Sequence, residues 1–316
     1  MPIKEFKKIL VTGGAGFLGL HMVEALIERG FYVRVIDNFM CSSRENLKPY
    51  SKKIDLVEGD IRESGDVKKA VKDMDAVFHF AAIRSVVKSV EDPLLAHEVN
   101  ATGTLLLLNY AYEAKVKRFI FTSTSSVYGE ATRKYQKENG DLKPISPYGM
   151  AKLLAEQYGK YFFKERRFPT TSVRIFNVYG PRQNPESKYS LVIPGVLSKI
   201  FKNESPVIDG TGEQARDFIF VDDILEAFFR ILSSRRACGE VYNLGAGSTT
   251  SINTLVRMLL KLTGSGLKPV HGPRRPGDPD RTCADVAKAR RDFGWTPRVG
   301  LEAGLKRVVE WYKNNG

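Results

Sequence analysis

Short apolar runs alternate with longer amphipathic segments through the first half of the chain. Runs rich in β-branched and aromatic residues cover 7–13, 31–37, 54–60, 76–82, 117–123 and 170–178. Helical patterns lie between them, at 17–29, 64–73, 93–114 and 147–167. Strands that alternate with helices in this way are typical of βαβ units. The pattern therefore predicts an α/β fold with a doubly wound parallel sheet and helices on both faces.

The regular alternation of strands and helices ends after Gly180. Shorter elements follow, and they are interrupted by Pro181, Pro185, Pro194 and Pro206. We therefore place a boundary near residue 178, between a first unit at 1–178 and a smaller mixed α/β unit at 179–316. The run "RDFIFV" and the helical pattern at 222–232 form one more strand and helix. We expect residues 220–245 to pack back on the first sheet.

Composition fits a soluble globular protein with a sizeable core. The chain has 316 residues, of which 42% are hydrophobic and 27% charged. Its "LLLL" run at 105–108 is far shorter than the roughly 20 residues of a membrane span. The first apolar run, "ILV", is too short for a signal peptide. We therefore expect a cytoplasmic protein without a membrane partner.

The charge balance favours anionic partners. The formal net charge is +13, from 49 basic and 36 acidic residues. The basic residues are spread along the chain, which favours phosphorylated metabolites over nucleic acid. Cys41, Cys238 and Cys283 are far apart and in no ligand spacing, so we expect neither disulfides nor a metal site.

A glycine-rich turn follows the first strand. In "VTGGAGFLG", glycines allow the backbone to turn sharply and approach a pyrophosphate at a helix N-terminus. Such a turn alone is weak evidence, but Asp37 closes the second strand, where it would bind an adenosine ribose and repel a 2′-phosphate. We therefore predict NAD. Its predicted contacts include Gly13, Gly16, Phe17, Leu18, Gly19, Asp37, Asn38, Asp60, Ile61, Phe80, Ala81 and Ala82.

A second constellation joins a hydroxyl-rich strand end, "FTSTSSVYG", to "SPYGMAK". Tyr148 and Lys152 stand at i, i+4 near a helix start, so both lie on one face. A phenol with a pKa of about 10 is a poor base at neutral pH. A nearby ammonium and a positively charged nicotinamide would lower that pKa. An ordinary helix surface could also carry the pair, so the surrounding motifs decide.

Together these motifs, in this order, resemble the extended short-chain dehydrogenase/reductase family, which has a Rossmann-type sheet. The segments "VRIFNVYGPRQNP", "GTGEQARDFIFVDDI", "YNLGAG" and "RRPGDPDRTCADVAKA" resemble its nucleotide-sugar branch, most closely the UDP-glucose 4-epimerase group. The resemblance covers essentially the whole chain.

The resemblance implies reversible epimerisation at C4 of a UDP-hexose through a 4-keto intermediate with tightly bound NAD. Tyr148 would take the proton of the 4-hydroxyl, Thr124 would share that hydrogen bond, and Lys152 would hold the cofactor ribose and tune Tyr148. The same family pattern adds Arg84, Asn100, Thr122 and Phe176 on the cofactor side. On the substrate side it adds Ser125, Ser126, Asn177, Arg216, Arg275, Asp278 and Thr282.

Competing functions remain open. Sugar 4,6-dehydratases of this branch carry an acid pair where this chain has Ser125 and Ser126, which argues against that reaction. A UDP-glucuronate 4-epimerase is the main alternative. A non-catalytic Rossmann protein that binds NAD or RNA is a further one, and the intact Tyr148, Lys152 and Thr124 speak against it.

Two finer expectations follow from the resemblance. Thr282 stands where strict glucose enzymes have a bulky Tyr, so we expect N-acetylated hexoses to be accepted too. Family members usually pair as homodimers through two helices, here 93–114 and 148–166. The apolar stripes on these helices fit such pairing and fit ordinary core burial equally.

Overall fold

The computed structural model describes residues 3–130, 133–183, 192–274 and 279–315. Its centre is a seven-stranded sheet in the order β11-β6-β5-β4-β1-β2-β3. Every neighbouring pair in it is parallel, which confirms the predicted doubly wound sheet. The strands are β1 (Lys8–Thr12), β2 (Tyr32–Asp37), β3 (Ile54–Glu58), β4 (Ala76–His79), β5 (Arg118–Thr124), β6 (Thr170–Ile175) and β11 (Val241–Leu244).

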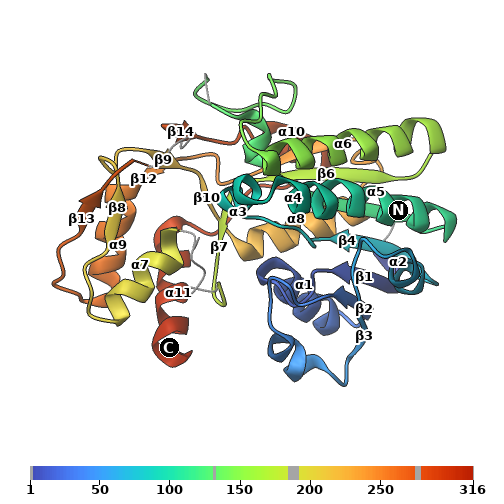
Figure 1. The fold of residues 1–316 in the computed structure, drawn as a ribbon, viewed down its shortest axis with the longest axis horizontal. Helices are drawn as coiled ribbons and strands as arrows, with labels where there is room; N and C mark the ends of the chain where they lie inside the picture. The colour runs from blue at the N-terminus through green and yellow to red at the C-terminus, as the bar shows by residue number, and fades with distance from the viewer. Residues whose placement is uncertain (1–2, 131–132, 184–191, 275–278, 316) are drawn as a thin grey trace.

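Helices cover both faces of this sheet, which occupies the right half of Figure 1. One face packs on α1 (Phe17–Glu28) and α8 (Val221–Ser233), and the other on α2 (Ser64–Val71), α5 (Gly103–Glu113) and α6 (Pro147–Arg166). Both β5 and β6 are buried along their whole length. Such burial explains why parallel strands read as continuous apolar runs.

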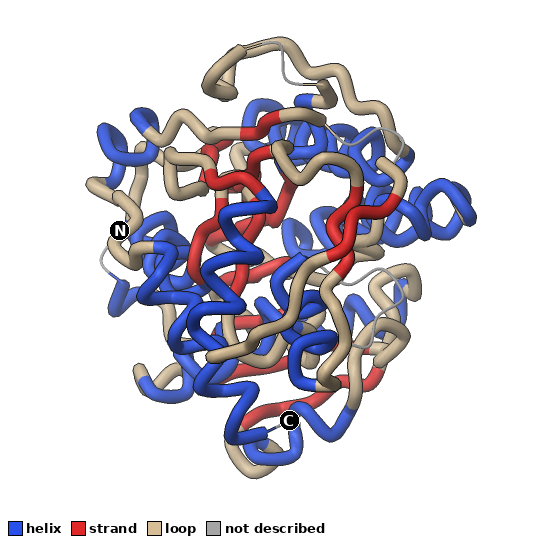
Figure 2. Tube along the Cα trace, turned by 90° about the vertical axis from the view of Figure 1, so that its left-hand side faces the viewer, coloured by secondary structure: helices blue, strands red, loops and turns tan. Residues whose placement is uncertain are grey.

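The smaller unit lies at the left of Figure 1 and faces the viewer in Figure 2. Its core joins α7 (Val192–Phe201), α9 (Ile252–Thr263) and α11 (Leu301–Asn315). Short strands complete it: β8 (Val207–Asp209) pairs with β13 (Val270–Gly272), and β9 (Ala215–Arg216) lies between β12 (Thr250–Ser251) and β14 (Arg281–Thr282).

The chain crosses between the two units more than once. The run expected as one strand at 170–178 breaks at Phe176, whose backbone N–H donates to Leu244 O at 2.9 Å. The following β7 (Asn177–Tyr179) leaves the large sheet and pairs with β10 (Phe218–Phe220). Later, α8 and β11 return to the large sheet. A boundary near residue 178 stays a prediction.

The remaining helices are short. Three short elements precede α5 in the chain: α3 (Val86–Glu91), α4 (Pro93–His97) and a π-helical turn (Glu98–Thr102). Helix α10 (Ala287–Phe293) packs beside β11. The 3₁₀ turns are η1 (Ile3–Glu5), η2 (Arg44–Tyr50) and η4 (Ser125–Tyr128). None of the helices in the described ranges is long and apolar enough to cross a membrane.

Candidate active site

The glycine turn at the carboxyl end of β1 is packed too closely for any side chain. Gly13 has φ +67°, and a Cβ there would lie 2.7 Å from Ala81 N. A Cβ on Gly19 would lie 2.1 Å from Gly13 O. Helix α1 starts at Gly16 without a side-chain cap, which leaves its first N–H groups for an anion. The turn therefore fits a dinucleotide pyrophosphate.

Asp37 lies at the end of β2 and braces this turn. Its carboxylate accepts hydrogen bonds from Ala15 N at 2.9 Å and Phe39 N at 2.8 Å. The next acid, Asp60, accepts from Asn38 Nδ2 at 2.8 Å and pairs with Arg62 at 2.8 Å. Burial opposes ionisation of Asp60, but its bonds to Arg62 outweigh this and lower its pKa. Both acids stand where the adenosine half of NAD was predicted.

Other predicted cofactor residues have their side chains in the core or in a neighbouring cluster. Phe80 stacks near Phe228 with ring centroids 5.1 Å apart. Ile61 is buried against the helices that cover one face of the sheet. Phe17 and Leu18 pack on the core of the smaller unit. Any contact with NAD from these four residues would come mainly from the backbone.

Asn100 is fully buried in the π-helical turn and holds the segment after β4. Its side chain accepts from Ile83 N at 3.0 Å and donates to Ile83 O at 2.9 Å. This bond pair fixes the backbone between Ala82 and Arg84. The Asn100 side chain therefore holds the backbone of the loop that was predicted to contact the cofactor. Asn100 itself lies in a π-helical turn, a feature that is often found at functional sites.

The predicted catalytic side chains lie at the end of β5 and the start of α6. Ser146 caps α6 by accepting from Gly149 N at 3.2 Å, and Pro147 occupies the first turn. The next N–H, that of Tyr148, donates to Ser89 Oγ of α3 at 3.1 Å. These contacts fix the first turn, so the phenol is buried close enough to the Thr124 hydroxyl for that group to lower its pKa.

Lys152 follows one turn later and is buried. Its ammonium donates to Thr122 O at 2.9 Å and lies 4.7 Å from the centre of the Phe121 ring. Thr122 in turn donates its hydroxyl to His79 O at 2.7 Å. Lys152 is therefore anchored to β5, on the same helix face as Tyr148.

Burial dominates the protonation of this pair. Burial raises the pKa of Tyr148, and the Thr124 hydrogen bond and then the charge of Arg84 pull it back in part. Burial lowers the pKa of Lys152 to about 7, against the opposing charge of Glu156. Lys152 is not among the groups that lower the pKa of the Tyr148 phenol in this structure. A lowered phenol pKa, as expected from the sequence, would therefore depend on the positive charge of the bound nicotinamide.

The serine row that follows is mostly structural. Ser126 N donates to Thr124 Oγ1, and Thr124 Oγ1 donates to Ser126 Oγ, both at 3.1 Å. Ser123 donates instead to Glu156, on the far side of the strand end. Ser125 and Ser126 both remain partly accessible. Thr124 is thus the hydroxyl that joins the row to the phenol.

Sequence reasoning missed a buried polar network behind these residues. Arg174 and Glu156 form an ion pair at 2.7 Å with no exposed side-chain surface. Arg174 also donates to Tyr128 Oη at 2.9 Å, which donates to Asn243 Oδ1 at 2.6 Å. The pattern "YGMAKLLAE" does place Glu156 one turn after Lys152, but nothing local identifies its partner on β6.

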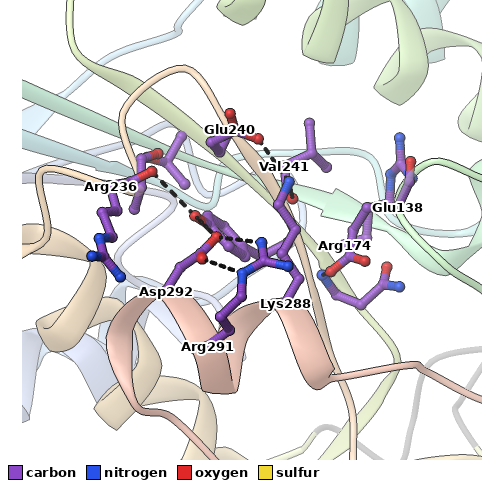
Figure 3. Close-up of polar contacts among 12 residues, drawn as sticks. Glu138, Arg174, Arg236, Glu240, Val241, Lys288, Arg291 and Asp292 are labelled. Carbon is purple, nitrogen blue, oxygen red and sulfur yellow. Dashed lines mark hydrogen bonds and ion pairs between the residues drawn. The ribbon is translucent and has the colours of Figure 1, made fainter.

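Figure 3 shows this region beside strand β11, with Glu138 and Arg174 next to it and Lys288 reaching from α10. Lys288 donates to Val241 O at 2.8 Å and pairs with Glu240 at 2.7 Å. Since β11 is an edge strand of the sheet, these contacts cover a carbonyl that would otherwise be open.

The predicted substrate residues converge on the short strands of the smaller unit. Asn177 donates through both its backbone N and its Nδ2 to Asp217 O, each at 3.1 Å. In the β9–β14 pair, Arg216 and Thr282 are register partners, so their side chains share a face. Thr282 Oγ1 is buried without a hydrogen-bond partner among the described residues. Phe176 is buried beside Tyr128.

Two predicted substrate residues, Arg275 and Asp278, lie outside the described residues. The remainder form one arrangement at the carboxyl edge of the sheet: a glycine turn with acids at the adenosine end, a buried Tyr–Thr–Lys group in the middle, and Arg216 with Thr282 at the other end. Ligands of open α/β sheets bind at this edge. A buried phenol beside a hydroxyl can exchange a proton with a bound alcohol.

Comparisons with known proteins show the family to which the chain belongs. A family model described as GDP-mannose 4,6 dehydratase matches residues 10–308. A relative from Methanocaldococcus jannaschii, named putative UDP-glucose 4-epimerase, is 37% identical over 309 residues, which cover 97% of this chain and 99% of the relative.

Solved structures match over nearly the whole chain. UDP-glucose 4-epimerase from Thermotoga maritima with UDP-glucose gives a TM-score of 0.93 at 37% identity, covering 97% of this chain and 99% of that one. UDP-N-acetylglucosamine 4-epimerase from Methanobrevibacter ruminantium, in complex with UDP-N-acetylmuramic acid, gives 0.93 at 35% identity, covering 98% and 99%.

A third structure contains the cofactor. UDP-glucuronic acid 4-epimerase from Bacillus cereus, in complex with UDP-glucuronic acid and NAD, gives a TM-score of 0.90 at 32% identity, covering 97% of this chain and 99% of that one. The glycine turn and Asp37 of this chain fit the same cofactor. The chain therefore belongs to the GDP-mannose 4,6-dehydratase family of extended short-chain dehydrogenases/reductases, which comprises NAD-dependent nucleotide-sugar epimerases and dehydratases.

Proposed function

We propose that this protein interconverts UDP-hexoses that differ at C4, with UDP-glucose and UDP-galactose as its first substrates. The observation that carries the proposal is the buried Tyr148 phenol next to the Thr124 hydroxyl, with Lys152 one turn along the same helix. A binding module has no use for a phenol held in this way. An enzyme that removes the proton of an alcohol requires it.

In this proposal Tyr148 takes the proton of the sugar 4-hydroxyl and later returns it. Thr124 shares that hydrogen bond, and Lys152 holds the cofactor ribose. The glycine turn and Asp37 would hold NAD, which would supply a reversible hydride acceptor for C4, so that a transient 4-keto sugar could be reduced on its other face. On the nucleotide side, Arg216 would pair with the diphosphate, since a guanidinium fork matches phosphate oxygens. Asn177 and Arg275 are proposed to contact the same diphosphate, and Asp278 is proposed to hold the uridine ribose.

Epimerisation is favoured over dehydration by the residues that follow Thr124. Elimination of water across C5 and C6 needs an acid and a base beside the sugar. Ser125 and Ser126 offer hydroxyls there, and Ser126 is already engaged with Thr124. Among the described residues, no carboxyl group hydrogen-bonds Thr124, Ser125 or Ser126.

UDP-glucuronate is the second candidate substrate, and the position of Arg84 favours it. Its guanidinium is close enough to the Tyr148 phenol to lower the pKa of that group by its charge. A cation beside the C4 hydroxyl is also near the substituent on C5, where UDP-glucuronate carries its carboxylate. Arg84 therefore offers the extra positive charge that a uronic acid needs.

Incubation of the purified protein with single UDP-sugars, without added cofactor, tests these assignments. We expect UDP-glucose and UDP-galactose to interconvert, with products identified by chromatography. The unpartnered Thr282 hydroxyl leaves a polar group at the proposed C2 pocket, so we expect turnover of UDP-N-acetylglucosamine and its C4 epimer. Thr282→Tyr should lose the acetylated substrates and keep the plain hexoses.

Each arm of this panel has an outcome that decides it. Turnover of UDP-glucuronate alone would replace the first candidate by the second. Formation of a 4-keto-6-deoxy sugar would overturn epimerisation altogether. Activity on UDP-galactose with none on its N-acetylated form, at matched concentrations, would refute the proposed role of Thr282.

We also propose that the protein is a homodimer through α3, α4 and α6, which pack against one another. This face exposes several large apolar side chains, including Leu94 at 75%, Val90 at 63% and Met150 at 56%. Helices 93–114 and 148–166 were the predicted pair, and α3 extends that surface. Burial of such a patch in a second copy would remove apolar area from water.

The expected mass in size-exclusion chromatography with light scattering is therefore twice 35.4 kDa. Leu94→Lys should shift the protein to a monomer, because a charge would be buried without a partner. Val207→Lys, at a similarly exposed apolar position on β8, is the matched control and should stay dimeric. A wild-type monomer at micromolar concentration would contradict the proposal.

A further inference from the structure

We infer that Asp217 is a positioning residue that assembles the nucleotide-sugar half of the site. Asp217 stands between β9 and β10, and its side chain is completely buried. It has no predicted contact with substrate or cofactor. Its contacts instead join the chain segments that carry Asn177, Arg216 and Thr282. The inference rests on the proposed function and names the residue that organises its substrate pocket.

The carboxylate of Asp217 accepts hydrogen bonds from the backbone N–H groups of two segments that are distant in sequence. Oδ1 accepts from Ala246 N at 2.6 Å, and Oδ2 accepts from Gly247 N at 3.0 Å and from Ala284 N at 2.9 Å. Ala246 and Gly247 belong to the loop after β11, and Ala284 follows β14. The thiol of Cys283 lies close enough to this carboxylate to lower its pKa. One side chain therefore ties β11 of the large sheet to β14 of the smaller unit.

The backbone of Asp217 completes the junction. Its carbonyl accepts both N–H donors of Asn177, so β7 is held at the same point. Arg216 precedes Asp217 directly, and Thr282 lies two residues before Ala284. Asn177 and Thr282 thus lie within two residues of a bond made by Asp217, and Arg216 is its direct chain neighbour.

A carboxylate is the group that this position requires. Three N–H donors converge on two oxygens, and an amide in its place would direct its own NH₂ at one of them. Space is also tight, because a Cβ on Gly245 would lie 2.7 Å from Asp217 Oδ2 and 2.6 Å from Ala284 Cβ. Burial raises the pKa of Asp217 to about 6, against the backbone hydrogen bonds that lower it. The group is therefore ionised at pH 8.

The test is UDP binding by Asp217→Asn at pH 8, measured by calorimetry on the protein as purified. We expect the Kd for UDP to rise at least tenfold and the KM for UDP-galactose to rise in parallel. The kcat should stay within about threefold, and the NAD content should not change, because Tyr148 and the glycine turn lie in other segments. This split between KM and kcat is a readout that a general loss of stability would not give.

Asp223→Asn is the matched control. Asp223 is also buried and uses its carboxylate in the same way, accepting from Arg298 N at 2.9 Å and Val299 N at 3.0 Å. These bonds hold the chain before α11 and none of the proposed substrate residues. The control should lose thermal stability and keep its UDP affinity within twofold.

The outcomes are separable. Unchanged UDP affinity in Asp217→Asn, or a loss no larger than in Asp223→Asn, overturns the inference while leaving the proposed function intact. Failure of the wild-type protein to bind UDP overturns both. If Asp217→Asn does not fold, Gly245→Ala serves in its place, since its methyl group pushes on the carboxylate and on Ala284. A UDP affinity weakened at least threefold in that variant supports the inference, and an unchanged one overturns it.

Discussion

Tyr148→Phe should reduce kcat for UDP-galactose by a factor of about 10² to 10⁴, the range that a positioned acid–base group contributes. The change removes one oxygen of a buried side chain that lies close to the Thr124 hydroxyl. It leaves the ring, its packing and the first turn of α6 in place. The bond from Tyr148 N to Ser89 Oγ belongs to the backbone and also remains. We therefore expect the variant to fold and to retain NAD.

Tyr161→Phe is the matched control, because Tyr161 lies on the same helix and its side chain is 49% exposed. The same atom is removed, yet kcat should not change. Steady-state kinetics, the melting temperature and the NAD content of both variants decide the matter. A Tyr148→Phe enzyme with wild-type kcat would mean that another group takes the proton of the alcohol.

The active-site group was predictable because its parts are local in sequence. The i, i+4 spacing of Tyr148 and Lys152 fixes them on one helix face, and a strand that ends in a hydroxyl row must end at the ligand edge of a parallel sheet. The alternation of strands and helices predicted the sheet for the same reason. Local patterns carry this information without any long-range contact.

Features that depend on distant segments were not predictable. No pattern near Phe176 indicates that the strand breaks there, because the residues that follow it pair with the distant strand β10 instead of with β11. Asn100 was expected at the cofactor, but its amide is used by Ile83. Asp217 is one acid among many in the sequence, and its role depends on N–H donors about 30 and 67 residues away.

The buried ion pair Arg174–Glu156 also depends on segments that are distant in sequence. We expect its disruption to have the largest effect on stability. It joins β6 to α6, and Glu156 also accepts the Ser123 hydroxyl next to Thr124. Burial lowers the pKa of Arg174, but the hydrogen bonds and charge of Glu156 outweigh it and raise the pKa above its usual value. The guanidinium therefore stays charged throughout the stable pH range.

Arg174→Met should lower the free energy of unfolding by about 3–5 kcal/mol, the cost of leaving a buried charge without its partner. The double variant Arg174→Met, Glu156→Leu should recover part of this loss, because it removes the uncompensated carboxylate as well. Arg230→Met, which breaks the half-exposed pair with Glu226 on α8, is the control and should cost less than about 1 kcal/mol. Denaturant unfolding of the wild type, these three variants and the single variant Glu156→Leu measures these differences. If the loss of unfolding free energy in the double variant equals the sum of the two single losses, the two side chains stabilise the fold independently. The ion pair would then have no energetic role in holding α6 against the sheet.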